Sequence, residues 1–253
     1  MKTSHRRTSS SGRRHRRGSS GPRRNKSFRN RGQRSARKLP TFDPSQFINK
    51  NPVTVSEEVY RPKHMFGDFG FHPNIVKVLK EKGISTPSPI QDQAIPLALA
   101  GNDVIGLAET GTGKTAAFLL PLIQKTLANK KQQTLILTPT RELALQVEAE
   151  FRIFSQPFKM YAATCVGGTS IRPQIRALKR NNQFIIGTPG RILDLLDRGE
   201  LRTDRIRNVV LDEADRMLDM GFIHDMRKIL GVIAHDRQTL FFSATMTKEA
   251  EAL

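Results

Sequence analysis

The sequence has a single cysteine, Cys165, and no apolar run long enough to cross a membrane. One cysteine cannot form a disulfide within the chain, so the disulfide-stapled secreted class is excluded and a reducing, cytoplasmic setting is expected. A membrane helix needs about 18 or more consecutive apolar residues, so we expect no membrane partner. No apolar segment follows the basic start of the chain, which argues against a secretory signal peptide.

Acidic residues are absent from residues 1–38, where fifteen of the chain's 42 Lys and Arg residues lie. This segment is rich in Arg, Ser and Gly, and it buries too little apolar area to offset the entropy of ordering. We therefore expect a disordered basic tail that binds RNA through its charge and supports ribonucleoprotein association. Two alternatives stay open. One is a solvated tail without a partner, and the other is an organelle transit peptide, although such peptides are amphipathic.

Residues 39–65 contain four prolines and several apolar side chains. We interpret this segment as a linker that leads into a folded domain spanning residues 66–253. Its apolar residues are compatible with docking on that domain and, equally, with an extended tether.

Short apolar runs alternate with segments of helical period from residue 66 onward. The expected strands are residues 103–107, 134–137, 161–166, 184–187, 208–211 and 239–242. The expected helices are residues 116–127, 141–154, 171–179 and 191–196. Strands that are apolar throughout and alternate with helices favour a parallel sheet covered on both faces, which is a doubly wound α/β fold. Such folds bind their ligands at the carboxyl ends of the strands.

A glycine-rich loop, residues 108–115, follows the first expected strand and precedes a helix. Gly111 and Gly113 allow backbone N–H groups to turn toward a phosphate, and the helix N-terminus adds partial positive charge. We expect Lys114 to reach the β- and γ-phosphates of ATP and the Thr115 hydroxyl to bind Mg²⁺. The loop begins with alanine where the general P-loop pattern has glycine, and the alternative is a chance Gly-rich turn.

Three acidic residues follow the expected strand 208–211 in the sequence Asp-Glu-Ala-Asp. Asp212 is a candidate ligand of Mg²⁺, directly or through water. Glu213 is placed to orient and deprotonate an attacking water molecule, and we expect Asp215 to serve an internal network. The alternative is a solvated acidic turn at a helix start, where the helix dipole favours negative charge.

The chain resembles the DEAD-box RNA helicases over about residues 66–253, because seven motifs of that family occur in order. They are Phe66 with the Q-motif segment 83–91, the P-loop 108–115, Pro-Thr-Arg-Glu-Leu at 139–143, Gly-Gly at 167–168, Thr-Pro-Gly-Arg at 188–191, Asp-Glu-Ala-Asp at 212–215 and Ser-Ala-Thr at 243–245. The P-loop of this family begins with alanine, which accounts for the departure in this sequence. The resemblance implies a RecA-like domain of an ATP-dependent RNA helicase.

The resemblance also implies a role for particular residues. Gln91 would read the adenine edge and Phe66 would stack near the base, although Phe66 is alternatively an ordinary core aromatic. The phosphates would lie against Thr110, Gly111, Thr112, Gly113, Lys114 and Thr115. The RNA backbone would be held, without reading of its sequence, by Thr140, Arg141, Gly168, Thr188 and Arg191. Ser243 and Thr245 would hydrogen-bond toward Asp215 and couple the ATP state to RNA binding.

The second helicase domain of the family is absent from this sequence, and no arginine after Glu213 matches its Arg-rich motif. We interpret the chain as a monomeric fragment, the N-terminal half of the enzyme. An arginine that stabilises charge on the γ-phosphate contributes about 10³–10⁵ in rate. We therefore expect this chain to bind nucleotide weakly and to hydrolyse it hardly at all.

Two further function classes stay open. An RNA-binding or annealing module would use ATP only as a conformational ligand, which the missing domain favours and the intact Lys114 and Glu213 disfavour. A DNA helicase or another P-loop ATPase is disfavoured by the resemblance of residues 83–91 to the Q motif and by the Asp-Glu-Ala-Asp spelling.

Overall fold

The computed structural model describes residues 60–251. The basic tail predicted at residues 1–38 and most of the linker predicted at residues 39–65 lie outside the described residues. The end of that linker is described, and its Tyr60, Lys63 and His64 hydrogen-bond to Asp92. No helix in the described part of the chain combines the length and the apolar character needed to cross a membrane.

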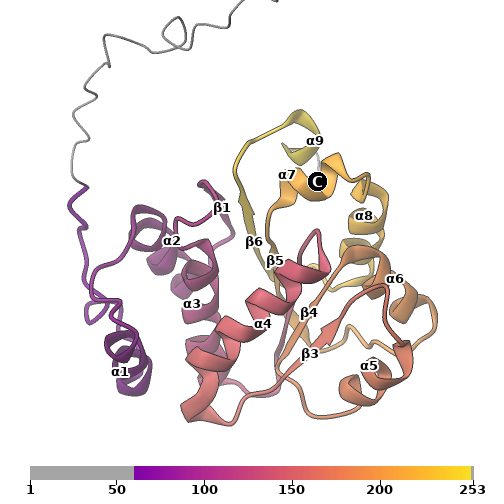
Figure 1. Cartoon of the computed structure of the whole chain (residues 1–253), viewed down its shortest axis with the longest axis horizontal. Coiled ribbons are helices and arrows are strands. Elements are labelled where there is room, and N and C mark those ends of the chain that lie inside the picture. Colours follow the sequence, from indigo (N-terminus) through magenta and orange to yellow (C-terminus); the bar gives the residue numbers. More distant parts are fainter. Residues whose placement is uncertain (1–59, 252–253) are drawn as a thin grey trace, which may run out of the picture. The chain divides into compact units, whose positions relative to one another are not determined.

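Within residues 60–251, six parallel strands form one sheet in the order β1-β6-β5-β2-β4-β3 (Figure 1). The strands are β1 (Val104–Leu107), β2 (Gln133–Leu137), β3 (Ala162–Cys165), β4 (Phe184–Gly187), β5 (Ile206–Leu211) and β6 (Gln238–Ser243). The apolar runs of the sequence therefore predicted every one of these strands, with ends that differ by at most two residues. β1 and β3 are the edge strands of the sheet.

Helices connect the strands and cover both faces of the sheet, which confirms the doubly wound α/β fold (Figure 1). They are α1 (Pro73–Glu81), α2 (Pro89–Ala100), α3 (Lys114–Ala128), α4 (Arg141–Ser155), a 3-10 turn η2 (Gln156–Phe158), α5 (Ile171–Leu178), α6 (Pro189–Asp197), α7 (Ala214–Asp219), α8 (Ile223–Val232) and α9 (Lys248–Glu251). The hydrophobic period of the sequence predicted α3 to α6 but did not single out α1, α2, α7 or α8. The sequence of α2 shows no helical period because the helix contains Pro96 and has apolar residues on several of its sides.

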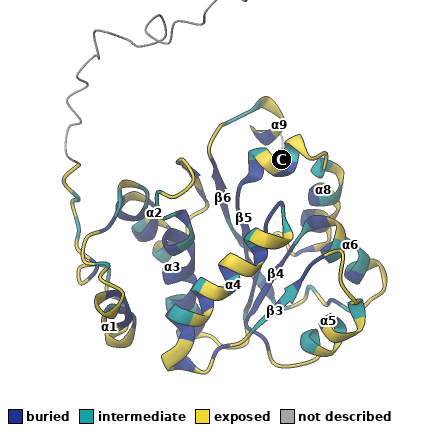
Figure 2. Cartoon of the chain, viewed as in Figure 1, coloured by how far each residue is buried: buried dark blue, intermediate teal, exposed yellow. Residues whose placement is uncertain are grey.

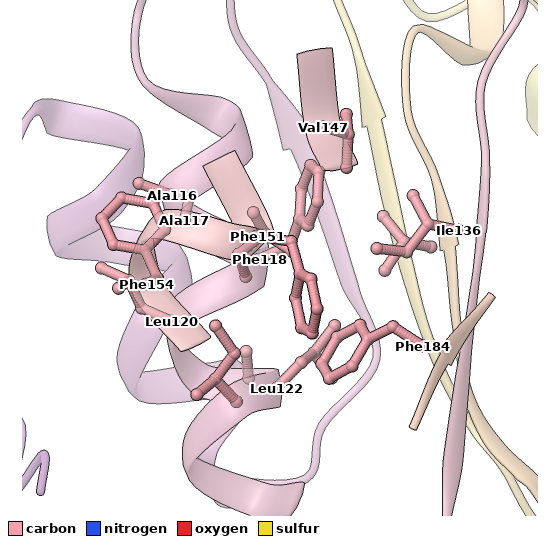
Figure 3. Close-up of a cluster of buried hydrophobic side chains, with 14 of the residues drawn as sticks. Ala116, Ala117, Phe118, Leu120, Leu122, Ile136, Val147, Phe151, Phe154 and Phe184 are labelled. Carbon is pink, nitrogen blue, oxygen red and sulfur yellow. The ribbon is translucent and has the colours of Figure 1, made fainter. Parts of the chain in front are cut away.

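Each face of the sheet has its own hydrophobic core, and buried residues follow both faces (Figure 2). On one side, α1 to α4 pack against the sheet around Phe118, Phe151 and Phe184 (Figure 3). The rings of Phe151 and Phe184 lie 4.4 Å apart between centroids, which joins α4 to β4. On the other side, α6, α7 and α8 contribute buried residues such as Met217 and Ile229. Full burial of each such side chain stabilises the fold by about 1.5–3 kcal/mol.

Candidate functional site

The loops that follow the strands lie at one edge of the sheet, because the strands are parallel. The loops after β1, β6 and β5 belong to one half of that edge, and those after β2, β4 and β3 belong to the other half. The first half carries the residues expected to bind ATP, and the second half carries those expected to bind RNA. The strand order thus places the two groups of predicted site residues side by side along the edge.

The P-loop joins β1 to α3 with two glycines in the left-handed region, Gly111 at φ 87° and Gly113 at φ 93°. A side chain at either position would be strained, so glycine is required for this path. Lys114 is only 6% exposed, and its Nζ donates a hydrogen bond to the Ala108 carbonyl at 2.7 Å. The ammonium group therefore lies across the loop, where a bound phosphate would replace that carbonyl as its partner.

Gln91 ties α2 to the P-loop. Its Nε2 donates to the Gly113 carbonyl at 3.0 Å, and its Oε1 accepts from the Ser88 N–H at 3.0 Å. An amide has a second N–H and a second lone pair, so both ends of Gln91 keep the capacity to pair with an adenine edge. The structure thus adds to the expected adenine contact a structural contact with the loop itself.

A cavity of about 460 Å³ opens between α2, the P-loop, α4 and the acidic turn, which is a usual size for a small-molecule site. Its wall includes Gln91, Thr110, Gly111, Gly113, Lys114, Thr115, Asp212 and Glu213.

Two residues expected at the ATP site are not in the wall of this cavity. Thr112 instead donates its hydroxyl to the Glu109 carbonyl at 2.7 Å. Phe66 is 4% exposed and packs edge to face on Phe69, which is the position of a core aromatic.

Asp212 and Glu213 directly follow β5 in the wall of this cavity. Asp212 is buried, and its Oδ1 has no hydrogen-bond partner among the described residues. Burial raises the pKa of this carboxyl to about 7, although the nearby Lys114 charge lowers it. Glu213 adopts φ 52°, and its Oε2 accepts a hydrogen bond from Arg216 Nη1 at 3.2 Å. The two carboxylates therefore stand in different environments, one buried with an unpartnered oxygen and one oriented by an ion pair.

The donor set of the cavity fits a magnesium ion. Mg²⁺ prefers oxygen ligands and is usually bound by one or two carboxylates together with substrate phosphates. Asp212 offers an unpartnered buried oxygen, and the Thr115 hydroxyl lines the same cavity. Residues 60–251 contain no group of three or more His, Cys, Asp or Glu that could hold a metal alone. The site therefore suits a cation that arrives with a nucleotide.

Asp215 holds the end of β6 against α7. Its Oδ2 accepts from the Ala244 N–H at 3.1 Å and from the Thr245 N–H and Oγ1 at 2.9 and 3.1 Å. The Ser243 Oγ accepts from the Asp215 N–H at 3.2 Å and donates to the Thr245 carbonyl at 2.7 Å. Burial alone would raise the pKa of Asp215, but these hydrogen bonds and one from the Arg216 N–H outweigh it and lower the pKa. The turn after β6 is thereby connected to the acidic turn after β5.

On the other half of the edge, the residues expected to bind RNA follow β2, β3 and β4. Thr140 caps α4, with its Oγ1 accepting from the Leu143 N–H at 3.3 Å, and Arg141 beside it is exposed. Gly168 adopts φ 71° in an exposed turn after β3, and Thr188 precedes α6. Arg191 is not a free surface cation, because its guanidinium donates to the Gln174 Oε1 at 2.9 Å and to the Thr169 carbonyl at 3.1 Å.

Gln174 is a site residue that the sequence motifs did not reveal. It is 8% exposed, and its amide bonds to both the N–H and the carbonyl of Val166 and to the Thr169 hydroxyl. Together with its bond from Arg191, these contacts hold the turn that contains Gly168. No local signal marks such a glutamine, because its partners come from two other elements of the fold. Asp92, which binds Tyr60, Lys63 and His64, was missed for the same reason.

The fold and the cavity define a class of proteins, the RecA-like α/β domains with a P-loop. Residues 88–253 match the family model described as DEAD/DEAH box helicase, which is more than half of the chain. The chain belongs to the DEAD/DEAH box helicase family.

Two relatives place the chain within this family. It is 50% identical over 182 residues to the ATP-dependent RNA helicase CshA of Listeria monocytogenes, a match that covers 72% of this chain and 35% of the relative. It is 42% identical to a DEAD box protein from the hyperthermophile Methanococcus jannaschii, whose crystal structure matches with a TM-score of 0.72. That match covers 75% of this chain and 52% of the other. The chain thus spans about a third of the length of the first relative and about half of the second.

Proposed function

We propose that this chain is the ATP- and RNA-binding part of an ATP-dependent RNA helicase, in which ATP hydrolysis is coupled to the remodelling of RNA duplexes. The main support for the proposal is that one cavity is lined by all four of the residues expected to act on the phosphates: Lys114, Thr115, Asp212 and Glu213. The Listeria relative, an ATP-dependent RNA helicase by name, is identical at half of the aligned positions, which supports the same function.

In the proposed site, the P-loop backbone and Lys114 bind the phosphates, while Gln91 pairs with the adenine edge. Thr115 and Asp212 would hold Mg²⁺, which when bound neutralises charge on the phosphate oxygens. Glu213 orients a water molecule and accepts its proton as the water attacks the γ-phosphate. The ion pair with Arg216 keeps the Glu213 carboxylate in one orientation for that task.

The RNA backbone is assigned to the other half of the edge, to Thr140, Arg141, Gly168, Thr188 and Arg191. Exposed backbone, hydroxyl and guanidinium groups suit phosphate contacts that do not read sequence. Arg191 would act partly by fixing the Gly168 turn, since it is bonded to Gln174 and Thr169. The Asp215, Ser243 and Thr245 network is proposed to transmit the state of the ATP site.

A slow reaction is proposed for the 253-residue chain by itself. Among the described residues, no arginine lines the cavity, so nothing there can act on the γ-phosphate as an arginine finger. This observation favours one alternative, an ATP-gated RNA-binding or annealing module without helicase turnover. A monomeric protein in the cytoplasm, with the basic tail tethering RNA, remains part of the proposal.

The deciding experiment measures ATP hydrolysis, with and without RNA, by this chain and by a chain extended with a second helicase domain. Glu213→Gln is expected to lower the rate of the extended chain by at least about 10²-fold while ATP binding persists, because a general base is lost. Glu81→Gln, which removes an exposed carboxylate on α1, is the matched control and should keep the rate. If both wild-type chains bind ATP and RNA but neither turns over, the ATP-gated module is correct instead.

A further inference from the structure

The edge of the sheet at β3 and α5 carries a row of exposed arginines. Arg172, Arg176 and Arg180 are spaced four residues apart along α5 and the turn after it, and all three are exposed. Residues four apart lie on one face of a helix, and eight residues of helix rise about 12 Å. None of these three guanidinium groups has a hydrogen bond or an ion pair within residues 60–251, whereas the neighbouring Lys179 is paired with Glu200 at 3.3 Å. We call these three residues the arginine row.

An exposed aromatic ring stands at one end of the arginine row. Tyr161 is 60% exposed, and it lines a hollow of about 550 Å³ together with Arg152, Arg180 and Asn181. Arg152 is engaged by Glu148 at 2.6 Å, so the acidic residue in the wall of the hollow is already neutralised. The hollow therefore keeps an unopposed positive charge beside a flat ring.

The other end of the arginine row lies near the proposed RNA site. α5 is the crossover between the parallel neighbours β3 and β4, so it runs back against their direction (Figure 1). Arg172 therefore lies near the carboxyl end of β3, which is followed by the Gly168 turn. Arg180 lies near the amino end of β3, next to Tyr161. The row leads from the proposed RNA contacts down the outer edge of the sheet.

We propose that the arginine row and Tyr161 form an extension of the RNA site, which binds single-stranded RNA as it leaves the Gly168 turn. The arginines would contact successive phosphates, and one base would stack on Tyr161. Cationic side chains combined with an exposed aromatic ring are the features that bind single strands without sequence preference. An acidic protein segment could form ion pairs with the arginines, but acidic side chains do not stack on an aromatic ring such as Tyr161. The extension rests on the proposed function, because it needs RNA at the Gly168 turn.

Binding of a short oligouridylate and of one about twice as long tests the arginine row in the full 253-residue chain. The variant Arg172→Gln/Arg176→Gln/Arg180→Gln is expected to bind the short strand as the wild type does and to lose several-fold in affinity for the long strand. Its slope of log affinity against log salt should fall by about 2 for the long strand, since each phosphate contact in a single strand contributes about 0.7. The control Lys80→Gln/Lys130→Gln/Lys228→Gln removes equal charge from other elements and should match the wild type.

The stacking on Tyr161 can be observed directly, because the chain has no tryptophan and only two tyrosines. In a Tyr60→Phe background, the remaining tyrosine fluorescence should be quenched by the long strand and not by the short one. Tyr161→Ala should weaken binding of the long strand by about fivefold or more, and Tyr161→Phe should retain most of the affinity.

Three results separate the outcomes. Equal long-strand affinity of the arginine-row variant and its lysine control would overturn the extension. Competition by polyglutamate as strong as that by RNA, without quenching of Tyr161, would also overturn it and assign the surface to an acidic protein. If Arg141→Gln binds the short strand as tightly as the wild type does, that result would instead count against the proposed RNA site itself, whatever the affinity for the long strand.

Discussion

At the scale of single residues, the cavity beside the P-loop contains buried polar groups that lower the stability of the fold. Asp212 is buried with an unpartnered oxygen, and an unsatisfied buried acceptor costs about 1–3 kcal/mol. Lys114 is buried too, and its ammonium group donates a hydrogen bond to the Ala108 carbonyl. A fold keeps such groups where a ligand completes them, which is the physical reason for assigning a cation and a phosphate to this cavity.

Asp212→Asn should therefore change how the chain responds to ATP and magnesium. We expect ATP with Mg²⁺ at saturating concentration to raise the Tm of the wild type by about 5–10 °C more than ATP with EDTA does. In Asp212→Asn this difference should nearly vanish, while the Tm without ligand should stay equal or rise, because the buried carboxylate with its unpartnered oxygen is replaced by a neutral amide. Thermal melts check this, with Asp219→Asn on the exposed end of α7 as the control. An unchanged magnesium response in Asp212→Asn would remove Asp212 from the cation site.

At the scale of elements, Gln174 joins α5, α6 and the turn after β3 into one unit. The bonds run from Arg191 to Gln174 and from Gln174 to Val166 and Thr169. A side chain that satisfies partners on three elements fixes their relative positions, so the position of the exposed Gly168 depends on the buried Gln174.

Gln174→Leu is expected to lower RNA affinity several-fold and to leave ATP affinity unchanged, because the contacts of the amide lie in the half of the edge that we propose to bind RNA. Leaving the Val166 backbone groups unsatisfied should also cost about 1–3 kcal/mol of stability. Fluorescence anisotropy with labelled RNA and with a fluorescent ATP analogue checks the two affinities. Gln156→Leu, on the exposed turn η2, is the matched control. An equal loss of ATP affinity in Gln174→Leu would show a general effect on folding.

At the scale of the whole molecule, residues 60–64 are bonded to the rest of the domain by the buried carboxylate of Asp92. Asp92 accepts hydrogen bonds from the Tyr60 hydroxyl at 2.5 Å, from the Lys63 N–H at 2.7 Å and from the His64 N–H at 3.1 Å. Burial alone would raise the pKa of Asp92, but the bonds from Tyr60, Lys63 and His64 lower it to about 2. Since Asp92 follows Gln91 in α2, the same turn of helix binds the P-loop and the entering chain.

The lowered pKa of Asp92 predicts how stability depends on pH. The carboxylate is charged in the fold down to about pH 2 but titrates near 3.8 when unfolded, so its stabilisation is present above pH 3.8. That stabilisation, about 2 kcal/mol, is lost as the pH falls toward 2. Asp92→Asn should be less stable at neutral pH and should lack this part of the acid dependence in urea unfolding. Asp236→Asn, an exposed aspartate, should follow the wild type, and an identical pH profile for Asp92→Asn would contradict the prediction.

Several features follow from the sequence alone because they depend on neighbouring residues. The strand at Phe184–Gly187 is a continuous apolar run, and the P-loop needs glycine and lysine at a local spacing. α2 was not predicted from the hydrophobic period, because a helix that is apolar on several sides shows no such period. The role of Phe66 near the adenine base stays a prediction, whereas its burial against Phe69 is a tertiary contact that no local pattern specifies.

The sequence by itself determined the class of fold, the P-loop and the acidic turn, because alternating apolar runs and contiguous motifs carry that information locally. Only the tertiary structure decided which strands are neighbours, and hence that β6 lies between the P-loop strand and the acidic strand. It also decided the partners of Gln174 and Asp92, and it placed Arg180 of the arginine row beside Tyr161. Those contacts join residues from separate elements, and packing of the two cores on the sheet, which no local pattern specifies, brings them together.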